Sequence, residues 1–516
     1  MNIVDIIPFI LLAALLAFCI LIWVNKKSII APFKKIKRRT WIILILVLLA
    51  GFMLRFFVVE HMHNLYYDEL GYLDIAKHLA GEGEKCLCLH NIDGECLICN
   101  HSLKALGFTA LLAAFIKIFG LNAGVAFNMV AFIGVISIAM MFFFTYLLFQ
   151  KESIALFSAL ILAFHPLHVR WSGSVSPEIV SLFFITLTFI CLLLYTKSKV
   201  PLLIPSLLVL FFTLNIKQEN IVALPFFALP FLARKEYLKK FLPIAGFMSV
   251  LAILSMIGLY ITASGKALSP ALSYTFWKQG KLLSIPLLKK HFLTSMKFFL
   301  DANYTPYLII ALTIVGFFLL FKKKKLLAIT LLSGVIILPT LFTAYVGQAL
   351  TGSEVRHYIP GLIPTVIFSS YALASMGKLS LRRVKASYIV ALLVIVSVIA
   401  YIPYLTSKDS PYTPVQRDYE FVVESLQKIP KGCIIITQEP YIFDLHGQSA
   451  TSIHLPNLYL NNDCMYYYEG ESCYRIGLYK ICNEVAETLA LESKPYLSDG
   501  RHSFYKIKGD VLLNFN

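Results

Sequence analysis

The sequence predicts an all-α polytopic membrane domain, followed by a small α/β soluble domain outside the membrane. Of the 516 residues, 58% are hydrophobic and only 15% are charged, which is unusual for a soluble protein of this size. Apolar runs of about 18 residues or more recur up to residue 405, and each is long enough to cross a bilayer core. After Thr406 these runs stop and polar residues become common, so residues 406–516 are expected to form an external soluble domain.

Residues 1–40 are expected to form an extra N-terminal anchor helix and a basic cytoplasmic loop. The first apolar segment, Ile3–Val24, has no basic residues ahead of it and no small-residue cleavage site after it. These features favour a retained anchor over a signal peptide. Seven Lys and Arg residues follow between positions 26 and 39. Because short basic loops stay in the cytoplasm, this cluster places the N-terminus outside.

Residues 41–405 are predicted to form the main transmembrane domain. The remaining basic loops, including Lys322–Lys325, fall on one side, which predicts about twelve spans with both termini outside. Two long loops, 60–121 and 264–304, then lie outside. In the first, Tyr72–Leu79 and Leu103–Phe119 have the spacing of interfacial helices. The net charge of +17 is explained by the cytoplasmic loops, so nucleic-acid binding is not expected.

Three segments give the C-terminal domain its predicted α/β character. Val415–Leu426 has apolar residues at helical spacing, and Gly432–Thr437 has the pattern of a short buried strand. Ser503–Lys508 alternates polar and apolar residues like an edge strand.

Eight of the ten cysteines fall on the side assigned as external. Four lie in the first long loop and four in the C-terminal domain, and even counts in an oxidising compartment suggest disulfides. The loop cysteines also have the spacing Cys-x-Cys-x7-Cys-x2-Cys, with His90 and His101 nearby, which fits a tetrahedral zinc site. Both interpretations stay open for one set of residues: Cys86, Cys88, Cys96 and Cys99.

Asp68 and Glu69 are the strongest candidates for chemistry. They follow a hydrophobic span directly, and ionisable residues at a bilayer edge are costly and usually functional. The alternative is a solvated helix start, where acids are also favourable. A carboxylate there can act as a general base on a hydroxyl, while cations stabilise a departing phosphate. The same face is expected to collect further polar residues: Arg170, Glu178, Lys217, Arg356 and His357.

These residues lie in motifs that resemble a known family. Asp68-Glu69-x-x-Tyr72-x-x-x-Ala76 is similar to the Asp-Glu motif of membrane glycosyltransferases of the C-type (GT-C) fold, in the branch of protein O-mannosyltransferases and lipid A aminoarabinose transferases. Residues 100–103 with 119–120 resemble the family's His-Pro-Pro-Leu…Phe-Gly stretch, with the prolines replaced. Residues 165–178 look like its turn before the fourth core span. Arg356-His357-Tyr358-x-Pro360 is similar to its Arg-Tyr-x4-Pro signature, with His357 inserted.

The resemblance covers most of residues 41–405 and implies a mannosyltransferase-like enzyme with a polyprenyl (dolichyl)-phosphate sugar as donor. It implies inversion at the anomeric carbon and catalysis on the extracytoplasmic side of the cell membrane. The acceptor is a protein, as in protein glycosylation, or a lipid or a glycan. No cofactor follows with certainty, because some branches of the fold use a divalent metal ion. The oligosaccharyltransferase motif Trp-Trp-Asp-Tyr-Gly does not occur in the sequence.

The resemblance also assigns a role to each candidate residue. By motif position Asp68 is the general base, and Glu69 is its partner or a hydrogen-bonding residue behind it. Glu178 would orient the acceptor or hold the divalent ion. The donor phosphate would be bound by Arg356, Lys217, His357 and Arg170.

Two other functions compete with the enzyme. A transporter or flippase of lipid-linked or small polar substrates would place its charges near the bilayer midplane and often shows internal repeats. A sensor would need only a few spans to anchor an external ligand-binding domain. The charges here collect at one face instead, which favours the enzyme.

Overall fold

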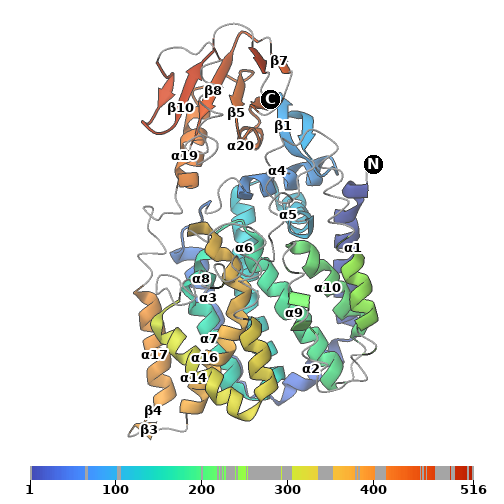
Figure 1. Ribbon diagram of the computed structural model, residues 1–516, viewed down its shortest axis with the longest axis vertical. Coiled ribbons are helices and arrows are strands. Elements are labelled where there is room, and N and C mark those ends of the chain that lie inside the picture. Colours follow the sequence, from blue (N-terminus) through green and yellow to red (C-terminus); the bar gives the residue numbers. More distant parts are fainter. Residues whose placement is uncertain are drawn as a thin grey trace.

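The computed structural model shows a helical bundle with a β-sheet region stacked on one end (Figure 1). It describes, apart from single residues between them, the following ranges: 3–63, 68–100, 106–198, 202–217, 242–251, 305–334, 352–377, 380–381, 384–400, 414–453, 458–460, 462–470, 494–507 and 511–513. The predicted outer loop 264–304 lies almost entirely outside these residues.

The bundle confirms a mostly helical membrane chain. Among the described residues, five helices are long and apolar enough to cross a membrane. They involve α1 (Ile3–Val24), α3 (Arg38–Met53) with the π-turn η2 (Leu54–Val58), α6 (Ala123–Phe149), α9 (Pro177–Ser198) and α16 (Leu362–Met376). Shorter helices complete the bundle: α2 (Lys26–Ile30), η1 (Ala31–Lys35), α7 (Glu152–Phe164), α8 (Pro166–Trp171), α10 (Leu203–Ile216), α14 (Tyr307–Lys323), the 3-10 helix η4 (Gly352–Gly361) and α17 (Ala386–Ile399). The number of twelve spans stays a prediction, because several expected spans fall outside the described residues.

Two helices of the bundle approach each other through small and hydroxyl-bearing residues. A side chain at Gly316 of α14 would overlap the backbone carbonyl of Phe368 in α16. Close to this point on the two helices, Thr313 Oγ1 and Ser369 Oγ lie 2.8 Å apart in a hydrogen bond. Small residues that allow close backbone approach, with hydroxyls bonded across, are typical of helix pairs in membranes.

We expect Gly316→Ala to destabilise the bundle. The added methyl must push α14 away from α16, and such overpacking costs about 1–3 kcal/mol. The measurement is the free energy of unfolding in detergent. Gly246→Ala is the matched control, because Gly246 is helical and a Cβ added there would meet no atom within 4 Å; there alanine should stabilise by about 0.5–1 kcal/mol. Equal effects of the two changes would contradict the close approach.

The external region combines two distant parts of the chain. Helices α4 (Asp68–Gly81) and α5 (Leu106–Phe119), both expected from helical spacing, lie between the bundle and the sheet (Figure 1). The sheet has seven strands in the order β2-β1-β6-β5-β8-β10-β9. Strands β1 (Leu87–Ile92) and β2 (Glu95–Asn100) come from the first long loop. The others follow residue 430: β5 (Ile434–Thr437), β6 (Ala450–Ser452), β8 (Met465–Glu469), β9 (Leu497–Ser498) and β10 (Ser503–Lys506).

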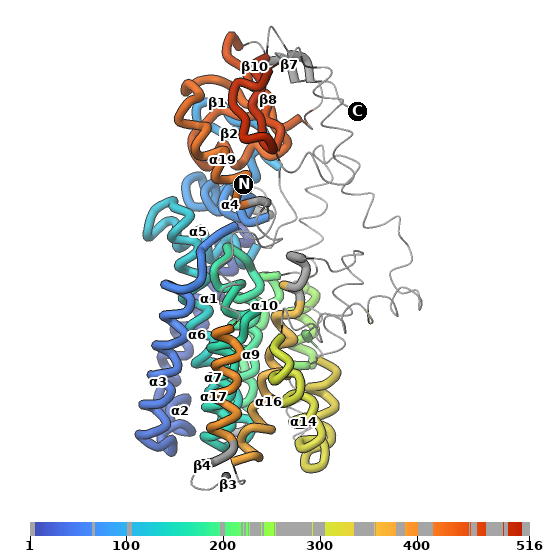
Figure 2. The backbone as a smooth tube through the Cα atoms, turned by 90° about the vertical axis from the view of Figure 1, so that its left-hand side faces the viewer, coloured from blue at the N-terminus to red at the C-terminus, as the bar shows by residue number. Residues whose placement is uncertain are grey.

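A tight turn and one strand pairing bring the loop into this sheet. Asp93 and Gly94 have φ values of 50° and 85°, so they form the two-residue turn of primed type that matches strand twist. In β1, His90 pairs with Thr451 of β6. The sequence did not predict this hairpin, and Figure 2 shows β1 and β2 among the C-terminal strands.

The expected C-terminal elements are present where the structure describes them. The helix predicted for Val415–Leu426 is α19 (Pro414–Leu426), and the two predicted strands are β5 and β10. Four short strands and one helical turn lie elsewhere: β3 (Ser380–Leu381), β4 (Val384–Lys385), β7 (Leu458–Leu460), β11 (Val511–Leu513) and α20 (Tyr441–Asp444). Disulfides join three cysteine pairs: Cys86–Cys99, Cys88–Cys96 and Cys433–Cys464. Cys473 and Cys482 lie outside the described residues.

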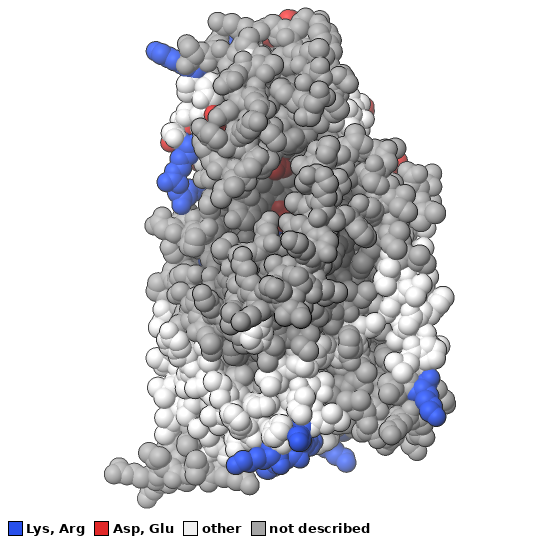
Figure 3. Space-filling view, in the orientation of Figure 1, with Lys and Arg blue, Asp and Glu red and all other residues white. Residues whose placement is uncertain are grey.

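Basic residues mark the other end of the bundle. Lys and Arg side chains gather at the end away from the sheet, where α14 finishes in Lys322 and Lys323, and a second group lies beside the sheet region (Figure 3). The face that carries α4 and the sheet is therefore opposite this basic end of the bundle.

Candidate active site

Four of the predicted site residues meet in one charged cluster at the sheet end of the bundle. Arg356 Nη2 lies 3.3 Å from Asp68 Oδ2, and Arg356 Nε lies 3.5 Å from Glu178 Oε1. Lys217 Nζ donates to the same Glu178 oxygen at 2.9 Å. Two acids and two cations that are distant in sequence thus form a continuous chain of ion pairs, Asp68–Arg356–Glu178–Lys217, called the charge cluster below.

Each member of the charge cluster sits at or near the end of an element. Asp68 is the first residue of α4, and Glu178 is the second residue of α9, after Pro177. Acids in a first helical turn and proline at the first helical position are both favourable. Lys217 follows the last residue of α10 in an extended conformation, and Arg356 lies within the short helix η4. Helix ends bring polar side chains to the membrane surface.

Burial differs sharply along the charge cluster. The Glu178 side chain is 1% exposed and that of Lys217 is 9% exposed, whereas Asp68 is 43% exposed. The buried carboxylate of Glu178 is compensated by two cations, as a buried charge must be. Asp68 is the member that an incoming molecule can reach.

Glu69 has other partners than its neighbour in sequence. Its side chain is fully buried. The backbone N–H of Val175 donates to Glu69 Oε2 at 2.8 Å, and His63 Nδ1 lies 3.2 Å from the same oxygen. These contacts fasten the start of α4 to the segment before α9 and thereby fix where Asp68 lies.

The structure gives fewer contacts for the other two predicted phosphate ligands, Arg170 and His357. Arg170 is a buried residue of α8, with Nη2 4.0 Å from Met62 Sδ. His357 follows Arg356 in η4, and its side chain lies outside the described part of the chain, as do residues 101–103. Their roles stay predictions.

A functional candidate that the sequence analysis missed is Arg55, in the π-turn that ends the second span. Its guanidinium is fully buried and donates to the carbonyls of Gly51 and Ala163 at 2.9 and 3.1 Å. It also lies 2.6 Å from His168 Nδ1 and 3.2 Å from Ser172 Oγ. Arg55 therefore ties three segments of the bundle together. The sequence feature that could have identified Arg55 is an arginine inside an apolar run, where charged residues are rare and usually functional.

A second polar cluster joins α4 to the sheet region. Asp444 of α20 accepts from Lys77 Nζ at 2.6 Å and contacts His78 Nε2 at 3.2 Å. Asp74, one turn earlier on α4, accepts from the backbone N–H of Cys88 at 2.8 Å and lies 3.7 Å from His78 Nε2. The helix that begins with Asp68 is thus bonded to both halves of the sheet.

The two acids of this cluster titrate differently. Burial, and then the nearby Asp444 carboxylate, raise the pKa of Asp74. For Asp444 burial acts in the same direction, but hydrogen bonds from His78, Asp74 and Lys77 outweigh it and lower its pKa to about 2. The pKa of Asp74 therefore lies above that of Asp444, so a proton held by the pair resides on Asp74 rather than on Asp444.

We expect Asp444→Asn to loosen the sheet region and Asp74→Asn to be tolerated. Asparagine at 444 removes the charge that Lys77 and His78 contact, and hydrogen bonds to charged groups contribute about 1.5–3 kcal/mol. Asparagine at 74 keeps an oxygen that can accept from Cys88. Hydrogen exchange of residues 87–100 measures the local opening, which should be faster in the first variant only. Equal exchange in the two variants would contradict this assignment.

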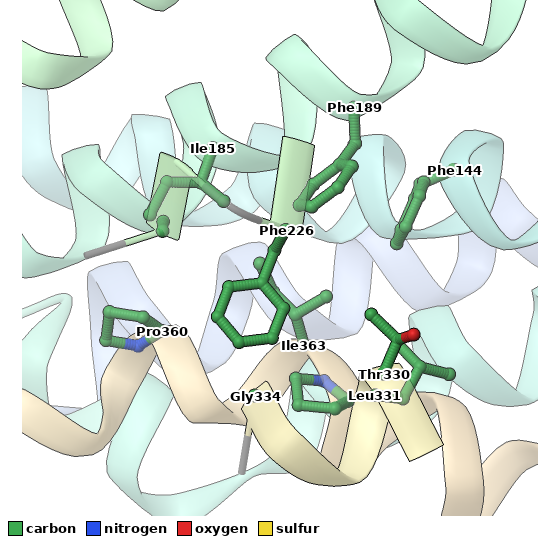
Figure 4. Close-up of a pocket in the computed structure, with 11 residues that line it drawn as sticks. Phe144, Ile185, Phe189, Phe226, Thr330, Leu331, Gly334, Pro360 and Ile363 are labelled. Carbon is green, nitrogen blue, oxygen red and sulfur yellow. The ribbon is translucent and has the colours of Figure 1, made fainter. Parts of the chain in front are cut away.

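An apolar pocket with a cavity volume of about 40 Å³ lies between the helices (Figure 4). The side chains that line it are mostly aromatic and aliphatic, and they include Phe144 of α6, Phe189 of α9, Leu331 of the helix at 325–334 and Pro360 of η4. Pro360 lies four residues after Arg356, so one short helix carries both a pocket wall and a cation of the charge cluster.

Comparison with known proteins identifies the fold. Residues 104–260 match the family model described as dolichyl-phosphate-mannose-protein mannosyltransferase. No curated protein sequence matches the chain. ArnT from Cupriavidus metallidurans in the apo state superimposes with a TM-score of 0.59 at 12% identity, over 90% of this chain and 97% of that chain. The same protein bound to undecaprenyl phosphate gives 0.53 at 12% identity, over 91% and 98%.

A third solved structure has a similar fold. The archaeal oligosaccharyltransferase AglB from Archaeoglobus fulgidus, in complex with an inhibitory peptide and a dolichol-phosphate, gives a TM-score of 0.52 at 12% identity, over 81% of this chain and 64% of that chain. The predicted resemblance to membrane proteins of the C-type glycosyltransferase fold is therefore confirmed.

Proposed function

We propose that this chain is a membrane glycosyltransferase that moves a sugar from a polyprenyl-phosphate donor to an acceptor hydroxyl on the extracytoplasmic face, with Asp68 as general base. The observation that carries the proposal is the contact of Asp68 with Arg356, 3.3 Å apart, since the short helix of Arg356 also lines the apolar pocket. A base, a phosphate-binding cation and a lipid groove are then neighbours.

The reaction follows from these positions as a single displacement. The acceptor oxygen attacks the anomeric carbon while Asp68 takes the hydroxyl proton. The bond from the anomeric carbon to the phosphate oxygen breaks on the opposite side, so the configuration inverts. The leaving polyprenyl phosphate gains negative charge, which Arg356 and Lys217 stabilise. Arginine offers a planar fork for two phosphate oxygens, and lysine supplies a point charge.

In this proposal the Asp68–Arg356 ion pair belongs to the enzyme without donor. When the phosphate arrives, Arg356 exchanges the carboxylate for phosphate oxygens and leaves Asp68 free to accept a proton. Glu178 holds both cations in place, and Glu69 fixes the start of α4. Arg170 and His357 are proposed as further phosphate ligands. Mannose is the expected sugar from the matching family model, and the acceptor is a protein, lipid or glycan hydroxyl.

Two findings support the donor class and the orientation. The neighbouring ArnT and AglB structures contain undecaprenyl phosphate and dolichol-phosphate respectively. Basic residues lie at the end of the bundle opposite the charge cluster (Figure 3), and basic loops face the cytoplasm in most membrane proteins. Both findings fit a multi-pass protein of about twelve spans whose active site lies on the extracytoplasmic side.

The direct test uses the purified full chain in detergent with a polyprenyl-phosphate sugar labelled in the sugar, together with a membrane extract as acceptor. Label should leave the donor lipid and appear on an acceptor. The donors are mannosyl, glucosyl and aminoarabinosyl lipids. If all remain intact while the same protein, reconstituted in vesicles, moves the lipid across the bilayer, the chain is a transporter and the proposal fails.

The apolar pocket should control the use of long donors. At Gly334 an added Cβ would meet Phe226 at 3.5 Å and Pro364 at 3.7 Å, so a leucine side chain can enter the pocket. We expect Gly334→Leu to raise KM for a long polyprenyl donor by about tenfold, or 1.4 kcal/mol. A donor with two isoprene units should be little affected, and Gly246→Leu is the control. Equal effects on both donors would remove the lipid tail from this pocket.

A further inference from the structure

The β1–β2 hairpin brings four sulfur atoms into one group. Cys86 is bonded to Cys99, and Cys88 is bonded to Cys96. The two bonds are not separate, because Cys86 Sγ lies only 3.5 Å from Cys96 Sγ of the other pair. The four sulfurs are called the sulfur cluster below.

The spacing inside the sulfur cluster is close to that of a metal site. Four thiolates held at about 2.3 Å from a tetrahedral zinc ion lie about 3.8 Å from one another. The contact between the two disulfides is already near this value. The strand ladder also holds three of these cysteines, since Cys88 pairs with Cys99 and Asn91 with Cys96, and Cys86 directly precedes β1. We expect this backbone pairing to keep the thiols close together when both disulfides open.

The sulfur cluster is partly buried, and polar side chains of α4 and α20 lie beside it. Cys86 and Cys88 are 2% and 1% exposed. A ring nitrogen of His78 lies within 4.8 Å of the sulfurs of Cys86 and Cys96, close to where it could donate a hydrogen bond. A second group of atoms within 4.8 Å of one another joins His78, Asp444 and the sulfur of Cys88. Polar groups beside metal ligands of this kind orient the ligands.

We propose that Cys86, Cys88, Cys96 and Cys99 bind one zinc ion as four thiolates when the two hairpin disulfides are reduced. With a phosphine as reductant, each disulfide takes up two electrons and two protons to give two thiols, and the phosphine and one water become phosphine oxide. Zinc then displaces the four thiol protons into solvent. The hairpin is fastened in both states, by two disulfides or by one metal ion.

The test measures metal on the full chain and does not depend on its activity. The protein is purified in detergent, reduced with a water-soluble phosphine, incubated with ZnCl2 and freed of unbound metal by gel filtration. Elemental analysis should find one zinc per chain after reduction and none in the oxidised protein. Replacement of zinc by Co²⁺ should produce thiolate-to-cobalt charge-transfer absorption.

Three variants make the result specific. Cys96→Ser with Cys99→Ser should lose the zinc, and Cys433→Ser with Cys464→Ser, which removes the other disulfide, should keep it. Cys99→His should also keep it, because histidine is a zinc ligand but forms no disulfide; it separates metal binding from misfolding, and gel filtration checks the fold of each variant. A reduced parent protein without zinc overturns the proposal, as does equal zinc in the Cys96→Ser/Cys99→Ser variant.

Discussion

Asp68→Asn should abolish sugar transfer while leaving the protein folded. Asparagine keeps the size of the side chain but cannot take the acceptor proton, and loss of a general base costs roughly 10²–10⁴-fold in rate. We expect kcat to fall by about 10³-fold with a saturating donor. Because Asp68 is 43% exposed, its loss should change the unfolding temperature little. The measurement is the transfer of labelled sugar by purified variants.

The control for this prediction is another exposed acid of the same region. Glu95 begins β2 and is exposed, so Glu95→Gln should retain the parent rate. Transfer by Asp68→Asn at the parent rate would take the base role away from Asp68. A variant that both loses activity and unfolds would assign Asp68 a structural role.

Glu178→Gln should be the most destabilising change in the charge cluster. Glu178 is 1% exposed and contacts both Lys217 and Arg356, so the variant removes the one buried carboxylate that these two cations share. Removing one partner of a buried ion pair costs about 3–5 kcal/mol. The measurement is the free energy of unfolding in detergent, with and without polyprenyl phosphate.

The effect of polyprenyl phosphate on the stability of the parent protein and of Glu178→Gln tests whether the cations bind phosphate. If the cations bind phosphate, polyprenyl phosphate supplies the missing negative charge and should stabilise Glu178→Gln more than the parent protein. The double variant Glu178→Gln/Lys217→Met also removes one of the two cations that Glu178 contacts and should recover part of the stability. Equal stabilisation of the parent and Glu178→Gln by the lipid would argue against phosphate binding at Arg356 and Lys217.

Sequence reasoning placed the charge cluster through sidedness. Asp68 and Arg356 are 288 positions apart, yet each follows or precedes an apolar run on the face opposite the basic loops. Hydropathy therefore assigned both to one membrane surface. It did not give the pairing within that surface, since the contacts of Arg356 with Asp68 and Glu178 depend on how η4 packs over α9.

Two features were beyond the reach of local patterns. The β1–β6 pairing joins His90 to Thr451, and no period in either short strand indicates so distant a partner. Arg55 was overlooked because a single arginine late in an apolar run resembles the end of a span, and only packing shows that it is buried. Glu69 shows a third limit: neighbours on a helix point about 100° apart, so adjacency to Asp68 does not imply a shared site.

The most direct measurement is a structure of the full chain with a non-hydrolysable polyprenyl phosphonate sugar bound. The account predicts the phosphonate oxygens at salt-bridge distance from Arg356 and Lys217, the lipid in the pocket lined by Phe189 and Pro360, and the anomeric carbon on the side of Asp68. Phosphonate density away from both cations, or a sugar beyond the reach of Asp68, would contradict the account.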